Sequence, residues 1–127
     1  MKRLIIVSTA ALCFALPAQA AAAPPAADLS FSAFPDAINQ NCDITASYVA
    51  SGFNKASSAE LFVVNQNGAV VVGPFTQLVT NGSVTIDPPF VFFNPYGTYT
   101  AVGHMFDKKG RVIANSEVTA GPTNCST

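Results

Sequence analysis

The stretch NPYGTYTAVGHMFDKKGRVIANSEVTA, residues 94–120, decides the fold of this chain. Two strand-like runs, 98–106 and 111–120, flank the tetrapeptide DKKG at 107–110. Asp107 can hydrogen-bond its own backbone and Gly110 accepts a positive φ, so these four residues favour a tight reversal. The stretch therefore predicts the last hairpin of an antiparallel β-sandwich.

Earlier segments carry short strand signals at regular spacing. Strands are predicted over 29–33, 42–48, 60–64, 69–72, 76–80, 83–86 and 90–93, with breaks at Pro35-Asp36 and at Asp87-Pro88-Pro89. Asn67-Gly68 and Asn81-Gly82 are the strongest short hairpin signals. About seven to eight short strands in one domain indicate a sandwich or a small barrel. The residues expected in the core are Tyr48, Leu61, Val63, Val84, Ile86, Tyr99, Ala101, Val112 and Val118.

Residues 1–20 have the composition of an export signal. A basic start at Lys2 and Arg3 precedes an apolar run over 4–16 and the small-x-small sequence AQA at 18–20. The competing reading, a transmembrane anchor, needs about 20 apolar residues, and this run is shorter. We therefore expect a signal peptide over 1–20, a disordered Ala/Pro lead-in over 21–27 and one domain over 28–127. The mature protein is expected to be exported to the periplasm or the medium without a transmembrane anchor.

Cysteine usage agrees with export. Cys13 lies in the predicted signal, which leaves Cys42 and Cys125. An even pair in an oxidising compartment predicts one disulfide.

The charge balance argues against nucleic acid as a partner. After residue 20 the chain has seven acidic and four basic residues, a net charge of −3 with His104 neutral. Lys108, Lys109 and Arg111 form a local spot rather than a basic stripe. They are expected to be a solvated turn.

The end of the chain resembles bacterial immunoglobulin-like domains. The similarity is carried by GTYTA at 97–101, by DKKG at 107–110 and by the closing Val118-Thr119. This resemblance implies an immunoglobulin-like antiparallel sandwich in which Tyr99 is the tyrosine-corner residue. Ala101 stands where antibody-type domains carry their second core cysteine, and the chain has no tryptophan. The resemblance is therefore to the broad bacterial class.

No catalytic or metal-binding constellation is visible in the sequence. His104 is the only histidine, and a triad or a zinc site would need further partners. Neighbouring strand residues point to opposite faces, so His104 and Met105 cannot share a metal. No cofactor and no enzymatic activity are predicted. The function classes that remain are an exported binding, adhesion or envelope-interaction module, a structural subunit of an envelope or surface assembly, and an enzyme inhibitor.

Strand parity predicts an apolar patch on the outside of one sheet. If Tyr99 and Ala101 point inward, the even-numbered residues of the same strand point outward. Outer sheet faces are normally polar, and an exposed apolar patch usually marks an interface. The predicted interaction face, for a second copy or another protein, consists of Phe62, Val64, Val102, His104, Phe106 and Ile113.

Overall fold

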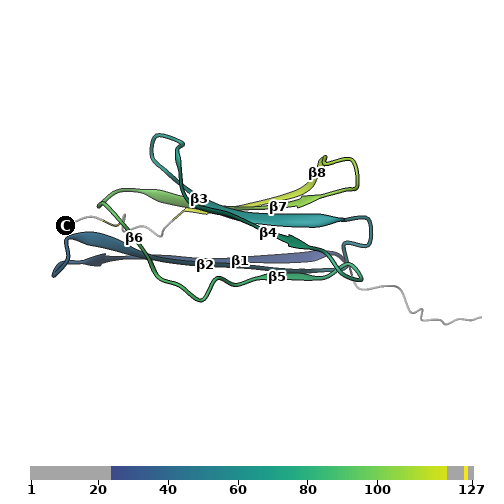
Figure 1. Ribbon diagram of the computed structural model, residues 1–127, viewed down its shortest axis with the longest axis horizontal. Helices are drawn as coiled ribbons and strands as arrows, with labels where there is room; N and C mark the ends of the chain where they lie inside the picture. Colours follow the sequence, from purple (N-terminus) through teal and green to yellow (C-terminus); the bar gives the residue numbers. More distant parts are fainter. Residues whose placement is uncertain (1–23, 120–124, 126–127) are drawn as a thin grey trace, which may run out of the picture.

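The computed structural model describes residues 24–119 and 125, and these residues form eight strands in two antiparallel sheets that face each other (Figure 1). This is the predicted all-β sandwich. The strands are β1 (Ala26–Asp36), β2 (Asn41–Ser51), β3 (Ser58–Asn65), β4 (Val70–Leu78), β5 (Val84–Ile86), β6 (Phe92–Asn94), β7 (Tyr99–Phe106) and β8 (Val112–Thr119).

One sheet has the order β1-β2-β5, with β6 also paired to β2, and the other has the order β4-β3-β7-β8. β5 and β6 pair with opposite halves of β2, at residues 48–50 and 42–44. The chain leaves the sheet between them, over residues 87–91. Pro88 and Pro89 cannot donate to a ladder, which explains why the strand is interrupted where the sequence predicted a stop.

The core divides into two clusters along the length of the sandwich. The cluster at the disulfide end contains Cys42, Ile44, Val63, Val72, Tyr99, Ala101 and Cys125. The cluster at the other end contains Tyr48, Ala50, Ala59, Leu61, Val84, Ile86 and Met105. We call this second end the basic end, because the β2–β3 and β7–β8 connections that carry Lys55, Lys108, Lys109 and Arg111 meet there.

The predicted final turn forms as expected. The backbone N–H of Asp107 donates to the Arg111 carbonyl at 3.0 Å, and Gly110 has a φ of 79°. The Asp107 carboxylate also accepts the backbone N–H groups of Lys109 and Arg111, both at 2.9 Å. The Asn67-Gly68 turn between β3 and β4 closes in a similar way, because the Asn65 carbonyl accepts the Gly68 N–H at 3.0 Å.

The second predicted hairpin is corrected by the structure. Asn81 and Gly82 both have positive φ, and Thr80 and Ser83 exchange two backbone hydrogen bonds of 2.9 and 3.0 Å. However, β4 and β5 belong to different sheets, so this turn carries the chain across the sandwich. Turn chemistry specifies the reversal itself, whereas burial decides what the flanking strands pair with.

The first strand is longer than the sequence suggested. β1 begins at Ala26, two residues before the predicted start of the domain, and it continues through Pro35 instead of breaking there. β1 is an edge strand, and an edge tolerates the missing N–H of proline. The predicted signal peptide and residues 21–23 of the lead-in lie outside the described residues. Within the described part of the chain, no helix is long and apolar enough to cross a membrane.

Candidate functional site

The solvent-facing side of the β4-β3-β7-β8 sheet, called here the β3–β7 face, is assembled from cross-strand rows. Even-numbered residues of β3 lie opposite even-numbered residues of β7. Each such pair is extended into a row by the residues that pair with it on β4 and β8. The rows are Leu78, Ser58, Phe106 and Val112; Thr76, Glu60, His104 and Asn115; Phe62, Val102 and Glu117; and Val70, Val64, Thr100 and Thr119.

An imidazole–carboxylate pair lies in the middle of this face. His104 Nδ1 is 2.9 Å from Glu60 Oε2, and both side chains are about one-fifth exposed, at 22% and 21%. The His104 ring also makes edge contacts with Phe62 and Phe106, with ring centroids 5.6 and 5.8 Å apart. Two phenylalanines and one carboxylate therefore fix the position of the only histidine.

The structure brings five of the six predicted face residues together on β3 and β7, and it places the sixth, Ile113, at the adjoining edge on β8. Val102 is buried, at 7% exposed, although it was predicted to belong to an exposed patch, whereas Ile113 is 41% exposed. Phe62, Val64, His104 and Phe106 are half-buried. None of the six belongs to the two buried core clusters.

Val112 is a correction to the predicted core. It is 52% exposed and pairs with Phe106, because a register shift between Met105 and Phe106 inserts one extra residue in β8. A β-bulge of this kind reverses the side on which the next residue lies. Val118, also predicted to be buried, is half-buried near the other end of β8.

Sequence reasoning missed three contributors to this face. Leu78 is 75% exposed and Val70 is 51% exposed, and both lie on β4 beside the predicted patch. Glu60 was assigned no role, although it holds His104. The alternation along residues 58–64 places Glu60 on the outer side of β3, so this residue could have been found from the sequence. The pairing of β4 with β3 contains two register shifts, which no local sequence pattern reveals.

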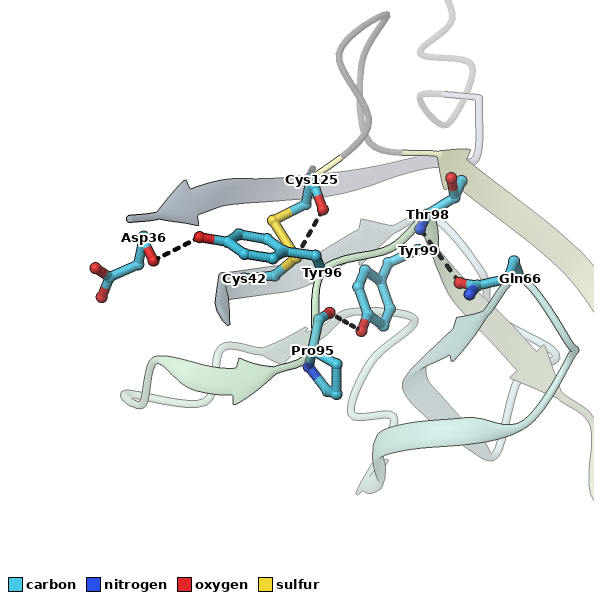
Figure 2. The surroundings of a disulfide bond; sticks show 8 residues. All are labelled: Asp36, Cys42, Gln66, Pro95, Tyr96, Thr98, Tyr99 and Cys125. Atoms are coloured by element: carbon cyan, nitrogen blue, oxygen red, sulfur yellow. Dashed lines mark hydrogen bonds between the residues drawn. A yellow bond between two sulfur atoms is a disulfide. The ribbon is translucent and has the colours of Figure 1, made fainter. Parts of the chain in front are cut away.

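The disulfide end is held by a second set of contacts (Figure 2). Cys42 and Cys125 are joined by a disulfide with a Cα–Cα distance of 5.8 Å, and both residues are fully buried. The Gly97 N–H donates to the Cys125 carbonyl at 2.7 Å. The hydroxyl of Tyr99, which was predicted to form a tyrosine corner, donates to the Pro95 carbonyl four residues upstream.

Local bonding and burial shift four pKa values. The Asn39 side chain lowers the pKa of Asp36, and the backbone N–H of Arg111 lowers the pKa of Asp107. Burial raises the pKa of Tyr48 and of Tyr99. Asp36 and Asp107 lie in turns, and Tyr48 and Tyr99 lie in the core.

Two shallow grooves flank the loop at 87–91. One, of about 380 Å³, lies between this loop and the paired strands β1 and β2, and the other, of about 510 Å³, lies between the loop and β4. The first is lined by hydroxyl groups, by the Asp87 carboxylate and by Phe90. Among residues 24–119 and 125, no three His, Cys, Asp or Glu side chains are placed to hold a metal ion.

Comparisons with known proteins give little further information. No family model matches the chain, and no curated protein matches it. One solved structure, a Bordetella pertussis protein provisionally named ApaA, aligns with 79% of this chain and 98% of its own length at 14% identity and a TM-score of 0.32. A TM-score this low does not establish a common fold.

Proposed function

We propose that this chain is an exported, non-catalytic binding module of the immunoglobulin-like class, and that it contacts a protein partner through the β3–β7 face. The observation that carries this proposal is the position of Phe62, His104 and Phe106. The His104 ring contacts both phenylalanine rings on the solvent side of a sheet, where polar residues are normally found.

Strand order supports the immunoglobulin-like class. β1, β2 and β5 correspond in order to strands A, B and E of such a domain, and β3, β7 and β8 to strands C, F and G. The Tyr99 bond to Pro95 at the start of β7 is where a tyrosine corner would lie. Export is supported by the signal-like residues 1–20 and by the paired cysteines.

The composition of the face supports protein contact. Leu78, Val112 and Ile113 are between 41% and 75% exposed and surround the end of the face that contains Phe106. A patch of large apolar side chains on a small domain usually marks an interface. Aromatic residues at the centre of such a patch commonly contribute most of the binding free energy. The Glu60–His104 pair adds a polar group that would select for partners able to match it.

The proposal is tested by Phe106→Asp, with Ile38→Asp as the matched control. Ile38 is 93% exposed in the β1–β2 turn, so the control adds the same charge away from the face. Both variants should melt like the wild type. In a pull-down from an envelope extract, Phe106→Asp should fail to retain the proteins that the wild type retains, whereas Ile38→Asp should retain them. Equal retention by the two variants, or unfolding caused by Phe106→Asp, would refute the role of this face.

A further inference from the structure

The basic residues of this sandwich are confined to one end of its length. Among the described residues, all four Lys and Arg side chains lie in the two connections at the basic end, at Lys55 and in the β7–β8 turn. The two connections are neighbours, because the Ser57 N–H donates to the Phe106 carbonyl at 2.7 Å. Figure 1 shows the β7–β8 turn at the opposite end of the molecule from β6.

The disulfide end carries acidic groups and no described cation. Asp36 is used locally, because its carboxylate accepts the backbone N–H groups of Ile38 and Asn39 and the Asn39 side chain at 2.8–3.1 Å. Asp43 is different. It lies on β2 in a cross-strand row between Phe34 on β1 and Phe93 on β6.

The two rings of this aromatic–acid row are unusually exposed. Phe34 is 64% exposed and Phe93 is 63% exposed, whereas the neighbouring Phe92 packs against the core. Adjacent strands are about 4.8 Å apart, so one ring lies on each side of the Asp43 carboxylate. An ammonium group placed on that carboxylate would lie within cation–π range of both rings.

Unsatisfied acceptors lie at the same place. Asp43 Oδ1 and Asn41 Oδ1 are shielded from solvent and have no hydrogen-bond partner among the described residues. Asn41 and Asp43 are two positions apart on β2, so both side chains lie on the same side of the strand. A shielded acceptor without a donor costs free energy. The carboxylate torsion is soft, so a small rotation of Asp43 would present its oxygen to an incoming donor.

We propose that the aromatic–acid row of one copy binds Lys108 or Lys109 of a second copy, so that the domains associate head to tail. The row offers acceptors and ring faces, and the chemistry that satisfies both is a cation. In this chain the accessible cations are concentrated at the opposite end. Arg111 is held by Asp107 at 2.7 Å, whereas Lys108 and Lys109 are exposed and make no ion pair among the described residues.

This contact is heterologous, because each copy supplies its lysine turn to one neighbour and its aromatic–acid row to another. Repetition of a heterologous contact gives a closed ring when the rotation between copies closes, and an open chain when it does not. It uses different residues from the β3–β7 face and does not depend on the proposed function. Exposed charges are screened within about 8–10 Å at ordinary ionic strength, so the association should weaken in high salt.

Two variants test the proposal by complementation. Asp43→Asn removes the carboxylate charge of the aromatic–acid row, and Lys108→Glu/Lys109→Glu removes the two lysines that would bind to it. In sedimentation velocity at low salt, the wild type should form a concentration-dependent series of oligomers. Each variant alone should be monomeric, with its association constant reduced at least about tenfold. An equal mixture should form dimers and no larger species, because the first variant keeps its lysines and the second keeps its aromatic–acid row.

Controls separate this contact from the β3–β7 face. Phe106→Asp should leave the head-to-tail series intact, and Phe34→Ala should weaken it without affecting the melting temperature. A monomeric wild type at millimolar concentration and low salt would overturn the proposal. So would a mixture of the two disabled variants that stays monomeric while each variant remains folded. Self-association that Phe106→Asp abolishes and Asp43→Asn leaves unchanged would assign the contact to the β3–β7 face instead.

Discussion

The two ends of the core each bury a tyrosine, but they hold it in different ways. At the disulfide end, Tyr99 is 3% exposed and its hydroxyl donates to the Pro95 carbonyl. At the basic end, Tyr48 is fully buried, and its hydroxyl lies near Ser116 without reaching hydrogen-bond geometry. Tyr99 is therefore held by a specific hydrogen bond near a cross-link, whereas Tyr48 is held by packing alone.

This difference teaches that similar burial does not imply similar sensitivity to substitution. A buried hydroxyl that has a partner contributes to stability, whereas one without a partner carries a desolvation cost. The Tyr48 ring offsets the desolvation cost of its hydroxyl by packing closely over Gly103. A Cβ added to Gly103 would lie 2.7 Å from the ring. Substitutions at the two ends should separate these contributions.

The largest effect is expected from removing the disulfide. Cys42 and Cys125 are 83 positions apart, and releasing a loop of this length should cost about 4–5 kcal/mol in the chain-entropy model. Denaturant melts of Cys42→Ala/Cys125→Ala should show this loss, and thiol titration of the wild type should find no reactive thiol. A double variant within about 1 kcal/mol of the wild type would show that the disulfide end does not depend on its cross-link.

A smaller loss is expected at the packed end from Gly103→Ala. The new methyl group would clash with the Tyr48 ring, which is enclosed and cannot move aside, so we expect a cost of about 1–3 kcal/mol. Gly97→Ala is the matched control. Its methyl group would meet only the amide of Gln66, at 2.8 Å, and that exposed side chain can turn away. Equal unfolding midpoints for the two variants would contradict the close packing over Gly103.

Tyr99→Phe should cost about 1–2 kcal/mol, because it leaves the Pro95 carbonyl without its donor. The ring stays, so core packing is kept and the loss reports the hydroxyl alone. Urea melts of the two proteins provide the measurement. An unchanged midpoint would mean that the hydrogen bond from Tyr99 to Pro95 contributes nothing to stability.

The same substitution at the other end should have the smallest effect. Tyr48→Phe removes a hydroxyl that has no partner, so the free energy of unfolding should stay constant or rise by up to about 1 kcal/mol. A loss as large as that of Tyr99→Phe would show that Ser116 does accept a hydrogen bond from Tyr48.

Alkaline pH should sharpen this contrast. Burial raises the pKa of Tyr48, so the folded state keeps the neutral hydroxyl while the unfolded state ionises. The stability that the folded protein gains by keeping Tyr48 neutral is complete below the pKa of about 10 that tyrosine has in the unfolded state. It is lost as the pH rises through the pKa of Tyr48 in the folded state. Melts at several pH values above 9 should show a slower loss of stability for Tyr48→Phe than for the wild type.

Local chemistry explains which features could be predicted from the sequence. The turn at 107–110 and the alternation in β2, β3 and β7 depend on neighbouring residues, and these elements form as predicted. The outward position of Phe62, His104 and Phe106 follows from the same alternation. The disulfide could be predicted because only two cysteines remain outside the signal-like segment.

Long-range pairing explains what could not be predicted. The bulge in β8 that turns Val112 outward is set by the partner strand β7, and the crossing at Asn81-Gly82 is set by burial in two different sheets. The two register shifts between β3 and β4 are also set by strand pairing, and no local pattern reveals them. The aromatic–acid row joins Phe34, Asp43 and Phe93 from three strands, and no local pattern relates residues so far apart in the sequence.

The break between β5 and β6 has a consequence for engineering and for variation among related chains. Residues 45–47 of β2 have no strand partner on the side where β5 and β6 pair. The connection at 87–91 therefore makes no ladder hydrogen bonds that would fix its length. Phe90 and Val91 in that connection are 62% and 48% exposed. Exposed connections of this kind tolerate insertions better than paired strands do. A peptide inserted after Pro89 would be displayed on the sandwich while both halves of β2 keep their partners.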